Sequence, residues 1–193
     1  MSESSSAECL SLRPVAQDER EALFDVLNEP RLQRVTLISG INQIHQVEWS
    51  EGQRTFAVHQ GDALIGAVDL HREDDDPGTW ELTVVLRVEG QKLGARAGLA
   101  GLFYAFTVLG ADAVWFWAPM EHKAVEKFAT RLGLAQLTQL KLPDGGMGQT
   151  YEIERDAWET GAASALSFYL AQMVEITDGH TCWRGEESGF FEL

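Results

Sequence analysis

One stretch of the chain, residues 79–110, constrains the fold more than any other. It begins with an apolar, β-branched run, Trp80–Val88, which predicts a buried strand. A polar loop with two glycines follows, Glu89–Gly94, and then a long apolar run, Ala95–Leu109, predicts a helix that ends in a left-handed cap at Gly110. A strand, a glycine loop and a buried helix in this order direct backbone N–H groups and the positive end of the helix dipole toward one point. The order therefore favours a binding site for a phosphate or pyrophosphate at the start of the helix.

The predicted helix carries a stripe of small residues. Gly94, Gly98, Gly101 and Ala105 follow one another at steps of four, three and four, which places them on one face. Because a glycine inside a helix costs about 1 kcal/mol relative to alanine, Gly98 and Gly101 imply that something approaches this face closely. The sequence leaves two explanations open, tight packing on the sheet or contact with a ligand, and it favours the packing.

The remaining elements predict an α/β fold with a mixed, mostly antiparallel sheet and helices on both faces. Further strands are predicted at Leu10–Val15, Arg54–Gln60, Ala63–His71, Ala113–Ala118, Ala135–Leu142 and Gln149–Glu154. Further helices are predicted from a cap at Asp18, over Arg31–Ile44, from Pro119 to Gly133, and over Glu159–Ile176 as a C-terminal helical extension. The 113–118 strand should lie parallel to the 80–88 strand, because a helix crosses between them.

Composition limits the classes of partner. The 193 residues carry 15 Lys and Arg against 30 Asp and Glu, a net charge of −15, so nucleic acid and anionic membranes are poor partners for the surface as a whole. A cationic substrate or a basic protein partner fits better. Cys9 and Cys182 imply no disulfide framework, and the pair His180 and Cys182 offers too few ligands for a metal. Without a signal peptide or a spanning segment, we expect a cytoplasmic setting.

Several short segments follow one another along the chain in an order that is informative about its family. They are Leu12-Arg13-Pro14 before a helix, the Gly90–Gly94 loop, Phe103-Tyr104-Ala105-Phe106, Arg131-Leu132-Gly133-Leu134, and Tyr151–Trp158. Taken together, they resemble the GNAT N-acyltransferases, most nearly the branch that acetylates ribosomal-protein N-termini and related amines. The resemblance covers about Leu10–Trp158. It implies a GNAT-like domain at 10–158, preceded by a flexible leader at 1–9 and followed by a C-terminal helix and aromatic tail at 159–193.

This resemblance implies a binding site for acetyl-CoA as co-substrate. The implied residues are Leu86, Val88, Gly90, Gln91, Lys92, Leu93, Gly94, Ala95 and Arg96, with His122 from the next helix. The family's pyrophosphate loop usually reads Gln or Arg, two residues, Gly, one residue, then Gly or Ala. In one register this chain places Lys92 at the first glycine, and in the other it places Arg96 at the last position. Either cation could contact the pyrophosphate directly, or the degenerate loop has lost its ligand. The family's tyrosine acid is also missing, since Phe128 or Ala129 stands near its place.

An amine acceptor must lose a proton before it attacks a thioester, so a carboxylate on the central strand is the natural base. Glu81 is that candidate, and its alternative interpretation is a solvated residue at the strand entrance. His122 is a candidate acid or a plain surface residue. Two functions follow. The first is transfer of an acetyl group from acetyl-CoA to an amine, on a small molecule or a peptide N-terminus. The second is a GNAT fold without catalysis that serves as a structural or interaction protein, such as a phage virion component.

The end of the chain is rich in aromatic residues. Trp183, Phe190 and Phe191 carry a large apolar surface in a polar context. The free energy gained by burying this surface should exceed the conformational entropy lost when a few residues become ordered. We therefore expect Glu159–Leu193 to pack across the domain, a second copy of it or a partner, which makes this tail the expected route to a homo-oligomer or a protein complex.

Overall fold

The computed structural model describes residues 9–33, 49–88, 92–142, 144–161, 174–186 and 189–193. The strands are β1 (Leu10–Pro14), β2 (Gln53–Gln60), β3 (Ala63–Arg72), β4 (Thr79–Leu86), β5 (Ala113–Pro119), β6 (Ala135–Lys141), β7 (Met147–Glu154), β8 (Val174–Thr177), β9 (Cys182–Glu186) and β10 (Gly189–Glu192). The helices are the 3₁₀-helix η1 (Gln17–Glu19), α1 (Arg20–Leu27), α3 (Leu93–Phe103), the π-helix η3 (Tyr104–Val108), α4 (Lys123–Leu132) and a segment at residues 155–161.

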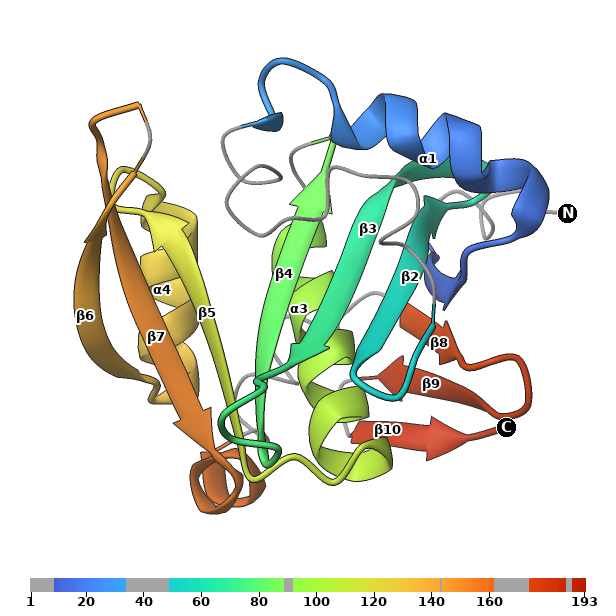
Figure 1. The fold of residues 1–193 in the computed structure, drawn as a ribbon. Helices are drawn as coiled ribbons and strands as arrows, with labels where there is room; N and C mark the ends of the chain where they lie inside the picture. The colour runs from blue at the N-terminus through green and yellow to red at the C-terminus, as the bar shows by residue number, and fades with distance from the viewer. Residues whose placement is uncertain (1–8, 34–48, 89–91, 143, 162–173, 187–188) are drawn as a thin grey trace, which may run out of the picture.

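The described strands form one ten-stranded sheet in the order β10-β9-β8-β1-β2-β3-β4-β5-β7-β6 (Figure 1). The pairs β4–β5 and β1–β8 are parallel, and the other neighbours are antiparallel. The predicted mixed, mostly antiparallel sheet is confirmed, and so is the parallel pairing of the 113–118 strand with the central strand. The crossover through α3 explains that pairing, because parallel neighbours need a long connection.

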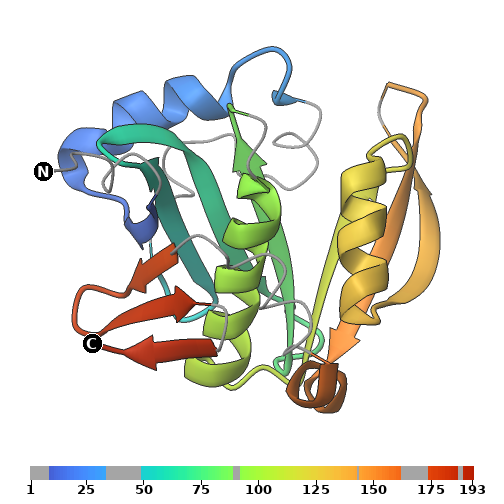
Figure 2. The same ribbon diagram turned by 180° about the vertical axis from the view of Figure 1, so that it is seen from behind.

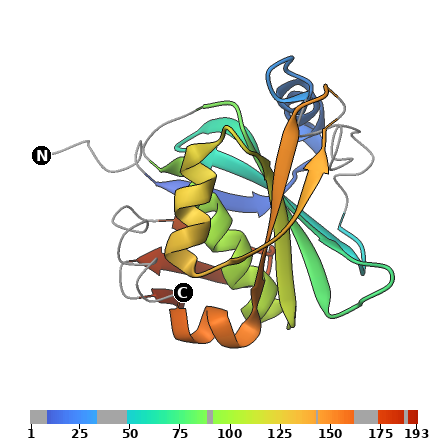
Figure 3. The same ribbon diagram turned by 90° about the vertical axis from the view of Figure 1, so that its left-hand side faces the viewer.

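Helices cover both faces of the sheet, as predicted (Figure 3). Helix α1 packs its Leu23 on Ala67 and Val85. Helix α3 packs on the opposite face, where Val68 and Leu82 approach its backbone. Adjacent residues of a strand point to opposite faces, so β3 and β4 contact α1 with one set of side chains and α3 with the other. None of the described helices is long and apolar enough to cross a membrane.

Within the small-residue stripe of α3, Gly98 and Gly101 face α4 and the sheet, whereas Gly94 is exposed. A Cβ atom on Gly101 would lie 2.7 Å from Leu82 Cδ1 and 3.1 Å from Val68 Cγ1, so the helix approaches the sheet more closely there than a side chain allows. A Cβ atom on Gly98 would lie 3.4 Å from Phe128 Cζ, which is ordinary contact. Close packing therefore accounts for the glycine at position 101.

This difference predicts the effect of two matched substitutions. Gly98→Ala should keep or raise stability, because alanine favours a helix by about 1 kcal/mol over glycine. Gly101→Ala should be less stable than Gly98→Ala by about 1–3 kcal/mol, because overpacking a filled core costs that much. Urea unfolding of both variants measures the difference. Equal stabilities would show that the core relaxes freely around position 101.

The end of the predicted helix 95–109 differs from the prediction, because its last part is the π-helix η3. Arg155 donates a hydrogen bond from Nη1 to the carbonyl of Phe106 at 3.0 Å and another from Nη2 to the carbonyl of Ala111. The first bond satisfies a carbonyl group of the last helical turn, where the helix itself leaves such groups without partners, and the second binds the chain just after the helix. Gly110 follows with a φ of 72°, so the predicted left-handed residue is confirmed.

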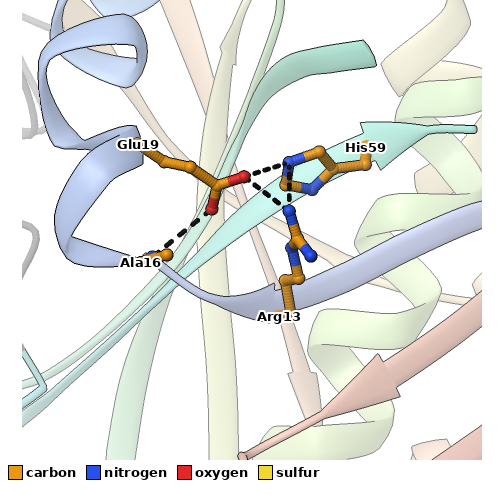
Figure 4. A network of polar contacts seen from close by, with 4 residues as sticks. All are labelled: Arg13, Ala16, Glu19 and His59. Carbon is orange, nitrogen blue, oxygen red and sulfur yellow. Dashed lines mark hydrogen bonds and ion pairs between the residues drawn. The ribbon is translucent and has the colours of Figure 1, made fainter. Parts of the chain in front are cut away.

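The start of the first helix also differs from the prediction, because Glu19 and not Asp18 bonds to the chain entry (Figure 4). The backbone N–H of Ala16 donates to Glu19 Oε2 at 3.4 Å. The other carboxylate oxygen lies 2.5 Å from Arg13 Nη2 and 2.9 Å from His59 Nε2. Burial alone would raise the pKa of Glu19, but the hydrogen bonds from His59 and Arg13 hold it below its ordinary value. These contacts tie the helix start to β1 and β2.

The predicted C-terminal helical extension is wrong at its end. Residues 155–161 are helical, 162–173 lie outside the described residues, and Val174–Thr177 forms β8. Strand β8 pairs with β1 and carries β9 and β10 beyond it, so these residues extend the sheet. The alternation of Val174 and Ile176 with polar neighbours gives the pattern of a half-buried strand, which outweighed the longer helical pattern. Residues 1–8 of the predicted leader 1–9 and most of the predicted helix 31–44 also lie outside the described residues.

The aromatic tail packs on the helix behind the sheet. The rings of Phe190 and Phe103 stack with centroids 4.2 Å apart. The indole of Trp183 lies edge-on to Phe103 at 6.1 Å and to Tyr104 at 5.8 Å. The expected packing of the tail across the domain is therefore confirmed for Trp183 and Phe190, which strands rather than a helix deliver, whereas Phe191 is exposed.

Candidate active site

The two central strands part in the middle of the sheet. Strands β4 and β5 pair only from Thr79 to Glu81, opposite Ala113 to Trp115. Beyond that point β4 continues along β3 and β5 continues along β7, so the two strands diverge (Figure 1). The backbone groups of β4 that point toward β5 beyond Glu81 therefore make no sheet bonds with β5.

Two helices begin at the open end of these strands. Helix α3 follows β4 and helix α4 follows β5, so both N-termini lie where the strands are farthest apart (Figure 2). The N–H groups of a helix start and its dipole favour a negatively charged group. Both helix starts therefore favour a negatively charged group at this end of the strands.

The predicted cofactor residues fall around the start of α3. Gly90 and Gln91 lie outside the described residues. The others are Leu86 and Ala95 (half-buried), Val88, Lys92 and Gly94 (exposed), and Leu93 and Arg96 (buried). His122, the remaining predicted residue, is exposed at the N-cap of α4. The helix predicted to start at Pro119 therefore begins four residues later, at Lys123.

The two cations that the sequence offered for a pyrophosphate occupy different environments. Lys92 is exposed directly before α3, with a left-handed φ of 57°. Arg96 is only 1% exposed, inside the first turns of the helix. A Cβ atom on Gly94 would meet nothing within 4 Å, so the surface beside Lys92 is open. Of the two cations, Lys92 is therefore the one whose side chain lies at the surface.

Glu81 lies at the last paired position before the strands part. Its neighbours in register are His71 on β3 and Trp115 on β5. Burial raises the pKa of Glu81 to about 7, and the negative charges of Glu73 and Asp69 act in the same direction. A carboxyl group that titrates near neutral pH can accept a proton and release it under ordinary conditions.

A second carboxylate, Asp69, lies on the same face of the sheet. It is 4% exposed, and its Oδ1 accepts hydrogen bonds from Thr55 Oγ1 at 2.5 Å and Gln53 Nε2 at 3.1 Å. Burial raises its pKa to about 6. Sequence reasoning missed Asp69, although it is the only charged residue in the apolar run Leu64–Leu70. Within the described residues, no three His, Cys, Asp or Glu side chains gather as metal ligands would.

A phenol lies on the other side of β5. Tyr151 on β7 is buried, and its ring stacks on Phe116 with centroids 5.4 Å apart. Burial raises its pKa, and the charge of Glu126 on α4 adds to that effect. Sequence reasoning looked for a tyrosine only on α4, where Phe128 packs against Gly98 instead. Tyr151 supplies a hydroxyl that keeps its proton at neutral pH.

Comparison with known proteins agrees with this geometry. The profile of the Acetyltransferase (GNAT) domain matches residues 10–135. The chain belongs to the GNAT acetyltransferase family. A search of curated proteins gave no match.

Solved structures share the fold at low sequence identity. Mutant forms of the spermidine/spermine N-acetyltransferase SpeG from Vibrio cholerae superpose with a TM-score of 0.63 at 14% identity, covering 79% of this chain and 98% of theirs. A chimera of SpeG from Vibrio cholerae with hSSAT gives 0.65 at 14% identity, covering 78% and 98%. The aminoglycoside acetyltransferase AAC(6')-Ib in complex with coenzyme A gives 0.61 at 15% identity, covering 78% and 97%.

Proposed function

We propose that this chain transfers an acetyl group from acetyl-CoA to an amine, with Glu81 as the general base. One observation carries the proposal. A half-buried carboxyl group with a pKa of about 7 lies at the last paired position of β4 and β5, two strands that are each followed by a helix. In a GNAT fold this is the point at which an acceptor amine and a thioester would meet.

Glu81 has the properties that proton removal requires. An amine that enters as a cation must lose a proton before its lone pair can attack. The deprotonated Glu81 takes that proton, directly or through one water molecule. The backbone N–H groups of β4 that point toward β5 beyond Glu81 are the available donors for negative charge on the acyl oxygen. Tyr151 offers a protonated hydroxyl for the leaving group.

The start of α3 is the proposed binding site of the co-substrate. Acetyl-CoA, when bound, supplies an acetyl group activated as a thioester. Lys92 and Gly94 would hold its diphosphate together with the helix N–H groups, and Gly90 and Gln91 would complete the loop. Leu86 and Val88 would line the approach from β4, and His122 the approach from α4. The buried Arg96 would act by supporting the helix from inside.

The acceptor is proposed to be a cationic amine. The chain has a net charge of −15, and Glu73 and Asp69 add negative charge beside Glu81. The names of two similar structures point to amines, spermidine and spermine for SpeG and an aminoglycoside for AAC(6')-Ib. A peptide N-terminus, as in the branch that the sequence resembles, is the alternative acceptor.

Two measurements test this function. Acetyl-CoA should raise the melting temperature, because a ligand that binds only the folded state stabilises it. A panel of spermidine, an aminoglycoside and a short peptide should then reveal which amine gains an acetyl group. No thermal shift and no acetylated product would rule out the enzyme.

Lys92 allows the cofactor site to be tested separately from the chemistry. Lys92→Ala should weaken acetyl-CoA binding by about 1–3 kcal/mol, because it removes a charged hydrogen bond to phosphate. The matched variant Lys92→Gly removes the same charge but tolerates the left-handed φ at this position. Calorimetric titration should give similar losses for both. If only the alanine variant lost affinity for acetyl-CoA, the effect would come from the left-handed backbone conformation at position 92 and not from the lost charge.

A non-catalytic role is the second candidate, and the loop favours it. Arg96 is buried at a position where the family's pattern has glycine or alanine in one register, and Lys92 replaces a glycine in the other. A chain that folds normally, binds no acetyl-CoA and acetylates no amine would be a structural or interaction protein, for which a phage virion is one setting.

A further inference from the structure

A hydrogen bond spans β4 at the point where β4 and β5 part. Trp115 on β5 donates from Nε1 to Glu73 Oε1 at 2.8 Å. Glu73 follows the end of β3, and its backbone N–H donates to the carbonyl of Thr79 at 2.9 Å. Glu81 lies between the two in register, paired with Trp115 on one side and with His71 on the other.

The side chains of this group share one face of the sheet. Residues paired across neighbouring strands point to the same side, and so do alternate residues of one strand. Glu81 and Trp115 therefore face the same way, and His71 and Glu73 continue that face beyond β4. The hydrogen bond from Trp115 holds the half-buried Glu73 carboxylate on this face, at the start of an acidic turn whose residues 74–77 are exposed.

We propose that Trp115 positions Glu73 so that the negative charge of Glu73 acts on Glu81 and favours proton uptake by Glu81. This inference rests on the proposed role of Glu81 as the base. In this proposal Glu73 is a positioning residue, because its charge acts through Glu81.

The other groups around Glu81 do not replace Glu73. Asp69 and His71 face Glu81 from β3, and Thr83 donates a hydrogen bond to it from β4, which lowers its pKa. After burial, the charge of Glu73 raises the pKa of Glu81 more than that of Asp69 does. Asp69 is bound by Thr55 and Gln53 on β2, whereas Glu73 is held from β5. Of these two carboxylates near Glu81, Glu73 is therefore the one whose described hydrogen bond comes from β5.

The test is a ¹³C NMR titration of the Glu81 carboxyl group in the full chain, with the signal assigned through its loss in Glu81→Gln. In Glu73→Gln the titration midpoint of Glu81 should fall by roughly half a pH unit or more, because a neighbouring like charge is removed. It should stay above the ordinary range of glutamate, because burial remains. Glutamine still accepts the Trp115 hydrogen bond, so the fold is preserved.

Two further variants separate the effect of the position of Glu73 from the effect of negative charge in its turn. Trp115→Phe should lower the midpoint in the same direction, because Glu73 loses the donor that holds it near Glu81. Asp75→Asn removes the same charge from an exposed position in the same turn and should leave the midpoint unchanged. The pH profile of kcat/KM should move with the midpoint in each variant.

The outcomes distinguish the inference from the proposed function. An unchanged Glu81 midpoint in Glu73→Gln overturns the inference even if the chain acetylates amines, and so does an equal shift in Asp75→Asn. A shifted midpoint in a chain that acetylates nothing overturns the proposed function and leaves the coupling of the two carboxylates established.

Discussion

Glu81→Gln is expected to lower turnover by about 100-fold or more while leaving acetyl-CoA affinity nearly unchanged. Glutamine keeps the size and the hydrogen-bonding oxygen of the side chain but cannot take up the proton of the amine. Steady-state kinetics with the best acceptor of the panel, together with calorimetric titration of acetyl-CoA, measures the two quantities separately. Glu154→Gln, at the exposed end of β7, is the matched control and should keep full turnover.

The role of Glu81 as a base also predicts the direction in which kcat/KM changes with pH. Because a base must be deprotonated to act, kcat/KM of the wild type should rise with pH and level off above about 7, the pKa of Glu81. Glu81→Gln should lose this rising limb. A variant that keeps both turnover and pH profile would return Glu81 to a structural role.

The dependence of stability on pH shows whether a loss of activity in Glu81→Gln could come from unfolding of the variant. The folded-state pKa of Glu81 lies above its unfolded value of 4.5, so the folded chain holds this proton more tightly than the unfolded chain. The resulting stabilisation is complete below pH 4.5 and is lost as the pH rises through about 7. Glu81→Gln removes that loss, so at pH 8 the variant should be at least as stable as the wild type.

The sequence predicts the central part of the fold well because its signals are local. The turn at Gly61, the left-handed caps at Gly110 and Gly133 and the alternation of strands with one long apolar helix mark β2 to β7 with small shifts at the ends. The edge of the sheet was harder to predict. Strands β8 to β10 have only four or five residues each, and their partners, β1 and one another, lie far away in the sequence or are equally short.

The candidate site was predictable only in part, for a physical reason. Glu81 could be found because it is a carboxylate on a recognisable strand. Its raised pKa comes first from burial and then from the charges of Glu73 and Asp69, which depend on how β3 packs beside β4, and no short-range pattern gives that register. The burial of Arg96 is likewise a consequence of packing at the start of α3, which the loop sequence alone cannot reveal.

The second large predicted effect is a loss of stability when aromatic residues of the C-terminal tail are replaced. Trp183→Ala should lower the free energy of unfolding by about 3 kcal/mol, the lower end for loss of a large aromatic side chain, because Trp183 is half-buried. Phe190→Ala should cost about 2 kcal/mol, since the ring stacks on Phe103 but keeps some exposure. Both losses of stability arise where β9 and β10 pack against the junction of α3 and η3.

The neighbouring residue on β10 provides the control. Phe191 is 48% exposed, so Phe191→Ala should change stability by only about 0.5 kcal/mol. Urea unfolding of the three variants compares them directly, and equal slopes against urea would show that the denatured states are alike. If the tail were a tether awaiting a partner, Phe190→Ala and Phe191→Ala would be equally harmless. A large difference between two adjacent phenylalanines requires the stacking on Phe103 and makes the C-terminal strands part of the folded domain that holds the candidate site.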